Sequence, residues 1–118
     1  MSALGLPTAQ VLVDVHAERE RQEEIGQRKR AEGIDWRSCA DPAMAGGDFA
    51  RFTVLGEEFG EVANAVLETA YGAASAVDLR AELVQVAAVA VAWVEAIDAR
   101  VTLTSSSALP DNRTDVPL

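Results

Sequence analysis

The feature that most constrains the fold is a run of twelve residues, 83–94, in which every residue except Gln85 is apolar. The run is too short to cross a bilayer, because a membrane-spanning helix needs about 20 apolar residues. A helix that is apolar nearly all round must instead be covered on most sides. A chain of 118 residues has few other helices for this purpose. We therefore expect further copies of the chain to complete the cover, in a homo-oligomer that is a dimer or a tetramer.

Elsewhere, apolar residues recur at three- and four-residue steps, and no stretch shows the period-two alternation of a strand. We therefore expect an all-α helical bundle of three long helices plus a short turn or helix, assembling as an oligomeric four-helix-type core. The expected helices cover residues 8–30, 49–71 and 76–99. Residues 1–101 are expected to form a single domain, and residues 102–118 are expected to form a flexible C-terminal tail.

Local signals mark the ends of these helices. Thr8 after Pro7 is typical of a helix start, and Gly72 is typical of a helix stop. Ser75 and Asp78 form a variant of the capping box at the start of the third helix. In the second helix a recurrent apolar stripe predicts one buried face, made of Phe52, Leu55, Phe59, Val62, Val66 and Leu67.

The charge balance restricts the classes of partner. The formal net charge is -9, which argues against binding to the phosphate backbone of a nucleic acid and suits cation binding. Cys39 is the only cysteine and His16 the only histidine, which excludes a disulfide framework, a cysteine-rich zinc site and a multi-histidine metal site. The start of the chain has neither the basic region nor the apolar stretch of a signal peptide. We therefore expect a cytoplasmic protein.

Two pairs of oxygen-bearing side chains fall inside otherwise apolar helices. Glu58 and Glu61 are three residues apart, and so are Glu82 and Gln85, so each pair shares one helix face. If the two helices form an antiparallel hairpin, the pairs face each other. Three carboxylates at low dielectric repel one another unless a cation neutralises them, and an oxygen-only ligand set favours Mg²⁺. The alternative interpretation is a solvated charged face on a purely structural acidic bundle.

These residues also carry a family resemblance. The pattern Glu57-Glu58-x-x-Glu61, followed after 20 residues by Glu82-x-x-Gln85, resembles the EExxE…ExxD signature of the MazG-like, all-α NTP pyrophosphatase superfamily. The run from Glu18 to Gln22 is similar to a segment in the first helix of many small MazG-like proteins. The resemblance covers residues 10–99, and its order of helices agrees with the order expected here.

The resemblance implies a function. Members of this family hydrolyse nucleoside triphosphates to a monophosphate and pyrophosphate, and they assemble as dimers or tetramers. Here it implies Mg²⁺, or Mn²⁺ as a substitute, held by Glu58, Glu61, Glu82 and Gln85, with Glu57 positioning or deprotonating the attacking water. The catalytic set is then Glu57, Glu58, Glu61 and Glu82, and the expected role is housecleaning of the nucleotide pool.

Two departures leave an alternative open. Gln85 stands where the family has Asp, and the basic C-terminal segment that contacts substrate in many members is missing. Contacts to the substrate must then come from elsewhere, and the candidates are Arg19, Arg21, Gln22 and Trp36. The alternative function is a catalytically weak MazG-like module that binds a nucleotide or a partner protein and regulates it.

Overall fold

The computed structural model describes residues 5–107, and all of its regular structure in that range is helical. The helices are α1 (Leu6–Ala31), α2 (Gly47–Ala70) and α3 (Ala76–Ser107). The all-α prediction with three long helices is therefore confirmed. No helix among the described residues is long and apolar enough to span a membrane.

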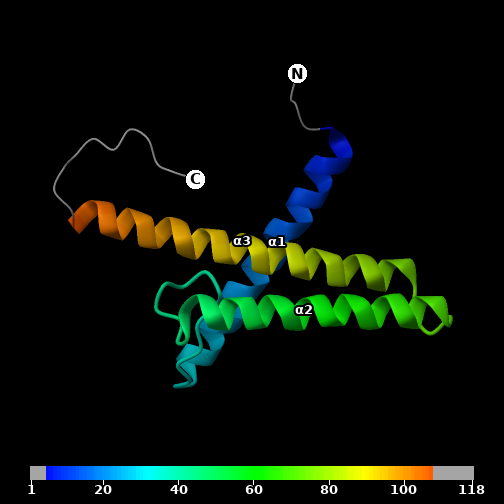
Figure 1. The fold of residues 1–118 in the computed structure, drawn as a ribbon, viewed down its shortest axis with the longest axis horizontal. Helices are drawn as coiled ribbons and strands as arrows, with labels where there is room; N and C mark the ends of the chain where they lie inside the picture. The colour runs from blue at the N-terminus through cyan, green and yellow to red at the C-terminus, as the bar shows by residue number, and fades with distance from the viewer. Residues whose placement is uncertain (1–4, 108–118) are drawn as a thin grey trace.

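α3 is the central element of the fold. It runs antiparallel beside α2 in a helical hairpin, and α1 crosses α3 on the other side, with the start of α1 projecting beyond the hairpin (Figure 1). The connection over residues 32–46 returns from the end of α1 to the start of α2. This arrangement places part of α1, the connection and the middle of the hairpin around a common space.

The helix ends follow the local signals in part. Ser75 and Asp78 form the expected capping box: the Ser75 amide donates to Asp78 Oδ2 at 2.8 Å, and the Asp78 amide donates to Ser75 Oγ at 3.3 Å. α2 ends just before Gly72, whose φ of +77° suits glycine. Thr8 does not cap α1, because the helix already begins at Leu6 and Gly5 is its N-cap.

The predicted end of the third helix at residue 99 is wrong by about two turns, because α3 continues to Ser107. Arg100 lies just past the predicted end and donates to Asp48 Oδ2 at 3.1 Å, which ties the extension to the start of α2. Residues 102–107 of the predicted tail are therefore helical, and residues 108–118 lie outside the described range.

The core is small and rich in alanine. Ala88, Ala92 and Ala96 of α3 are buried, and their small side chains permit close approach of the neighbouring elements. Around Val89, a cluster of apolar residues joins α3 to α2 and to the connection: Cys39, Ala40, Met44, Val54, Leu55 and Ala92.

Arg51 of α2 fixes the path of the connection. Its side chain is only 2% exposed. Nε donates to the carbonyl of Cys39 at 2.7 Å, and Nη2 donates to the carbonyl of Asp41 at 2.7 Å. Asp48 Oδ1 lies 3.1 Å from Nη1 and balances the charge of the buried guanidinium. One guanidinium therefore satisfies two backbone carbonyls that would otherwise lack partners.

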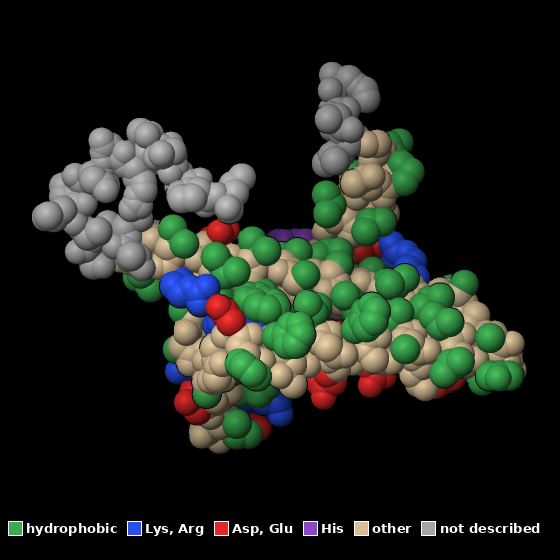
Figure 2. All heavy atoms as spheres, in the orientation of Figure 1, with side chains coloured by type: hydrophobic (Ala, Val, Ile, Leu, Met, Phe, Trp, Pro, Cys, Tyr) green, Lys and Arg blue, Asp and Glu red, His purple; other side chains and the backbone are tan. Residues whose placement is uncertain are grey.

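The apolar stripe of α2 is not buried as the periodicity predicts. Phe52 is 65% exposed, Phe59 is 66% exposed and Leu67 is 58% exposed, whereas Leu55 and Val62 are half-buried. Figure 2 shows apolar side chains along both helices of the hairpin on the face turned to the viewer. The prediction of one buried face is therefore wrong within a single chain, because α3 and the connection cover only its Leu55 side.

Candidate nucleotide and metal site

A pocket of about 250 Å³ lies where α1, the connection, α2 and α3 meet. Its walls come from four segments that are far apart in the sequence. α1 contributes Glu18, Arg21, Gln22 and Ile25, the connection contributes Trp36 to Cys39 and Met44, and the hairpin contributes Val54, Glu58, Gln85 and Val89. Five of the predicted site residues are thus brought together here: Arg21, Gln22, Trp36, Glu58 and Gln85.

The pocket is lined by both polar and apolar side chains. Glu18, Arg21, Glu58 and Gln85 supply charged and amide groups. Further polar groups come from Gln22, Arg37 and Ser38, and the apolar part of the lining consists of Ile25, Trp36, Met44, Val54 and Val89. Such a mixture is typical of a site that shelters a flat apolar group and orients it with a few polar contacts.

Glu58 is the carboxylate whose surroundings are most unusual. Burial raises the pKa of Glu58 above its ordinary value, and the negative charges of four neighbours raise it further, in the order Glu82, Glu57, Glu61 and Glu18. All three helices therefore direct acidic side chains toward the same region. A cation bound there would relieve this repulsion.

The other two predicted metal ligands border a neighbouring groove. Glu61 and Glu82 line a groove of about 340 Å³, together with Asn64, Glu68 and Asp78. The hairpin therefore places Glu58, Glu61 and Glu82 along the boundary between α2 and α3. It divides them between two adjacent cavities, with Glu58 in one and Glu61 and Glu82 in the other.

The donor chemistry of these residues suits Mg²⁺, because all of their ligating atoms are oxygens. The side chains as they stand do not form a ligand set: in the described range, 5–107, no three acidic, histidine or cysteine side chains are grouped closely enough to hold a metal ion. Glu57 and Glu61 are exposed, so their rotamers can change at little cost.

Arg19 and Arg21 have different surroundings although only one residue separates them. Arg21 is exposed at the pocket, where Nε donates to Glu18 Oε1 at 2.9 Å. Arg19 is only 7% exposed and donates to both oxygens of Glu95 on α3, at 2.8 and 3.2 Å, and to Glu23 at 2.8 Å. Arg19 is not among the residues that line the pocket, and its ion pairs join α1 to α3.

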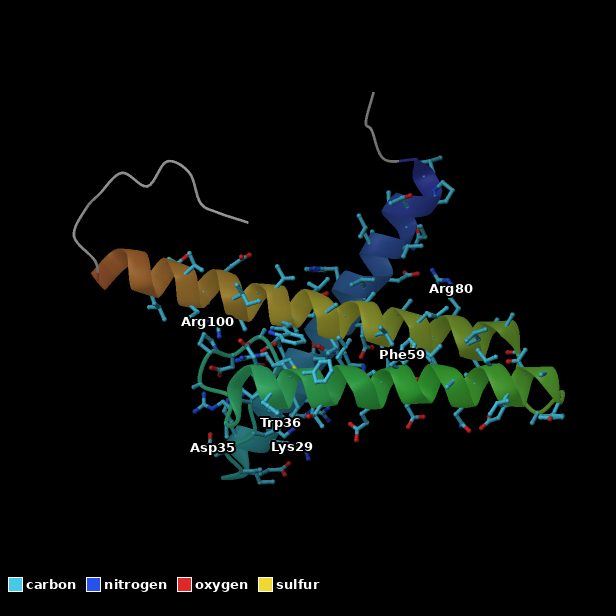
Figure 3. All side chains as sticks on the ribbon, in the orientation of Figure 1. Lys29, Asp35, Trp36, Phe59, Arg80 and Arg100 are labelled. Atoms are coloured by element: carbon cyan, nitrogen blue, oxygen red, sulfur yellow. The ribbon has the colours of Figure 1, made fainter. Side chains whose placement is uncertain are left out.

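Trp36 is held against α1. Its carbonyl accepts a hydrogen bond from Arg30 Nη1 at 2.9 Å. Its ring lies so close to Gly26 that a Cβ at this position would be 2.7 Å from Cζ3. Figure 3 shows Trp36 in the connection, close to the end of α1 that carries Lys29. One side of the ring therefore packs on the helix while the residue lines the pocket.

The sequence analysis missed three polar residues of the pocket: Glu18, Arg37 and Ser38. A signal for Glu18 was present, because Glu18, Arg21, Gln22 and Ile25 follow i, i+3, i+4, i+7 spacing and so share one helix face. No such signal exists for Ser38, whose Oγ donates to Glu23 at 2.6 Å only because the connection folds back on α1.

Comparison of the chain with protein-family models, with curated proteins and with solved structures gives no match in any of the three. The function must therefore be argued from the pocket and from the sequence pattern.

Proposed function

We propose that the chain is a Mg²⁺-dependent nucleoside triphosphate pyrophosphohydrolase, which converts an NTP or dNTP to the monophosphate and pyrophosphate. The observation that carries this proposal is the convergence of Arg21, Gln22, Trp36, Glu58 and Gln85 on one pocket. These residues come from four segments, and the sequence pattern alone singled them out. The proposed role is housecleaning of the nucleotide pool in the cytoplasm.

The roles of the individual residues follow from their positions. Trp36 and the apolar wall beside it accept the base, because a flat ring stacks well on an aromatic side chain. Arg21 and Gln22 on α1 contact the phosphates, since both line the pocket and carry hydrogen-bond donors. Arg19, already engaged by Glu95 and Glu23, is left out of this set.

Glu58, Glu61, Glu82 and Gln85 would hold Mg²⁺. When bound, the metal neutralises phosphate charge and lowers the pKa of a water molecule that attacks the α-phosphorus. Glu57 is exposed next to Glu58, and in this proposal it accepts the proton of the attacking water. The crowding of carboxylates around Glu58 supports a cation requirement, because a triphosphate would add further negative charge to an acidic site.

A second candidate function is nucleotide or partner-protein binding with little hydrolysis. Two observations favour it: Gln85 supplies an amide in place of a fourth carboxylate, and the described acidic side chains do not converge on one point. Either function is compatible with a homo-oligomer whose hairpins form a four-helix core, which we also propose.

The test is release of pyrophosphate from a panel of canonical and modified NTPs and dNTPs, with Mg²⁺, with Mn²⁺ and without metal. We expect metal-dependent release that Glu61→Ala and Glu58→Gln abolish. Glu32→Gln is the matched control, because it removes an exposed carboxylate that does not line the pocket, and it should leave the rate unchanged.

Absence of release from every nucleotide, with micromolar protein over hours, would overturn the enzymatic proposal. Nucleotide binding by calorimetry in the same samples would then identify the binding module. In that case Gln85→Asp is the first variant to make, because it restores the fourth carboxylate.

A further inference from the structure

The outward side of α2 carries an uninterrupted uncharged stripe that the described residues, 5–107, leave exposed. We call this stripe the α2 seam. Its members recur at alternating steps of three and four residues: Phe49, Phe52, Gly56, Phe59, Ala63, Val66 and Ala70. All seven are exposed, and Phe49 is the most exposed of the large ones, at 83%. A regular seven-residue repeat of apolar positions is the pattern by which helices pair.

Gly56 in the middle of the seam packs against no other element in the described part of the chain. A Cβ at this position would meet no atom within 4 Å. Glycine inside a helix lowers helix stability relative to alanine, and no contact seen among residues 5–107 offsets that loss. The α2 seam therefore combines exposed aromatic rings with a flat surface that nothing in residues 5–107 contacts.

Large and small residues alternate along the α2 seam. Phe52, Phe59 and Val66 occupy one position of the repeat, and Gly56, Ala63 and Ala70 occupy the other. In a parallel two-fold pair each residue faces its own copy, so phenylalanine would meet phenylalanine and glycine would face glycine. In an antiparallel pair, large residues of one copy can lie over small residues of the other, which allows dense packing.

We propose that the α2 seam binds the same seam of a second copy, antiparallel, with Phe59 of each copy seated over Gly56 of the other and Phe52 over Ala63. In this register every seam residue from Phe49 to Val66 faces another seam residue. The proposal specifies the partner and register of the oligomer, and it is independent of the catalytic activity.

The exposed rings of the α2 seam supply a large apolar contact area. With about 200 Å² for each phenylalanine side chain, the exposed fractions of the three rings amount to about 400 Å². Exposed Val66 and Leu67 of α2 add to this area, so the seam supplies more than half of the roughly 800 Å² per partner of a standard interface. Figure 2 shows this apolar surface continuing across both helices of the hairpin.

Charge also favours a second copy at this face. The chain carries a net charge of -9, so most of its surface repels another copy. Glu57, Glu61 and Glu68 lie on the side of α2 opposite to the seam, as the helical periodicity requires, and acidic side chains project from the edge of the hairpin below the apolar face in Figure 2. The α2 seam is thus a surface on which two acidic chains can meet without placing negative charges against each other.

The first test measures the mass of the full-length chain by sedimentation equilibrium over a range of concentrations. We expect the wild-type chain to self-associate and Phe59→Glu to raise the dissociation constant at least about 30-fold, as expected for a central aromatic anchor. Val13→Glu is the matched control, because it places the same charge on an exposed apolar residue of α1 and should leave association unchanged. A monomeric wild-type chain, or association that Phe59→Glu leaves intact, overturns the proposal.

The second test determines the direction and register with a short thiol-specific crosslinker. The double variant Phe52→Cys with Ala63→Cys should form covalent dimers, and neither single variant should. The single variant Ala70→Cys should also form no covalent dimers, because in this register the two copies of residue 70 are about 37 Å apart along the helices. Cys39 is buried and common to all samples, so the wild-type chain is the blank. Crosslinking of Ala70→Cys, or none of the double variant, overturns the antiparallel register.

Discussion

Gly26 permits the close packing that places Trp36 at the pocket, and adding one methyl group tests this. In Gly26→Ala the new Cβ would lie 2.7 Å from Cζ3 and 2.8 Å from Cε3 of the Trp36 ring, well inside the carbon–carbon contact distance of about 3.5 Å. The ring must move, and overpacking of this kind costs about 1–3 kcal/mol. Replacement of a helical glycine by alanine regains about 1 kcal/mol. The expected net change in unfolding free energy therefore lies between neutral and a loss of about 2 kcal/mol.

Gly60→Ala is the matched control for this prediction. Gly60 is also inside a helix, but a Cβ there would meet no atom within 4 Å, so this variant should gain about 1 kcal/mol. The unfolding free energies of the two variants should differ by about 1–3 kcal/mol. The measurement is urea unfolding, monitored by far-UV circular dichroism at one protein concentration. The fluorescence of Trp36, read in a Trp93→Phe background, should shift only in Gly26→Ala. Equal stabilisation of the two variants with unchanged fluorescence would refute the packing argument.

Two further predictions separate charge effects in the site from those that hold the fold. The pKa of Glu58 is raised in the folded protein. The ionised carboxylate therefore destabilises the folded protein at pH values above this raised pKa, and the destabilisation disappears as the pH falls below the ordinary value of 4.5. Glu58→Gln should therefore raise the urea midpoint at pH 7.5 and leave it unchanged at pH 4; the same increase at both pH values would contradict this explanation. Arg19→Met should lower the unfolding free energy by about 1–3 kcal/mol, since it removes charged hydrogen bonds of a buried guanidinium to Glu95 and Glu23. Arg21→Met should lower it by less than about 1 kcal/mol, because the Arg21 side chain is half exposed to solvent. Similar losses in urea unfolding would count against the assigned roles.

The helices were predictable from the sequence because their signals are local. Steps of three and four residues, the capping box at Ser75 and the stop at Gly72 depend only on neighbouring residues, and the structure confirms each of them. The end of α3 was missed because it depends on a distant contact. Arg100 pairs with Asp48, which lies 52 positions earlier in the chain, and nothing near residue 99 indicates this contact.

Burial was harder to predict than helicity. The spacing of Phe52, Phe59 and Val66 shows that one side of α2 is apolar, but it does not show which body covers that side. Within the chain α3 covers only the neighbouring side, which carries Leu55 and Val62. A periodic pattern therefore predicts an interface without stating whether its other half belongs to the same chain.

The pocket was predictable as a set of residues but not as a geometry. Successive residues of a helix are about 100° apart, so Arg19 and Arg21 project about 160° apart, and only the position of α3 decides which of the two is buried. Trp36 reaches the pocket because Arg51 binds the carbonyls of Cys39 and Asp41 and so sets the path of the connection. Neither arrangement has a signature in a sequence pattern.

The charge of the pocket explains why, in the proposed function, nucleotide binding requires a metal ion. Both arginines that line it are already engaged by acids, Arg21 by Glu18 and Arg37 by Asp35 and Asp41, while Glu58 carries the repulsion of four carboxylates. A triphosphate brings several more negative charges into this field, so the protein by itself offers it little electrostatic attraction. Apolar contacts with Trp36 and its neighbours can retain a base but cannot neutralise phosphates. In the proposed function, a divalent cation held by the carboxylates of α2 and α3 would therefore turn this acidic pocket into a site for a nucleotide, whether the chain then hydrolyses that nucleotide or only binds it.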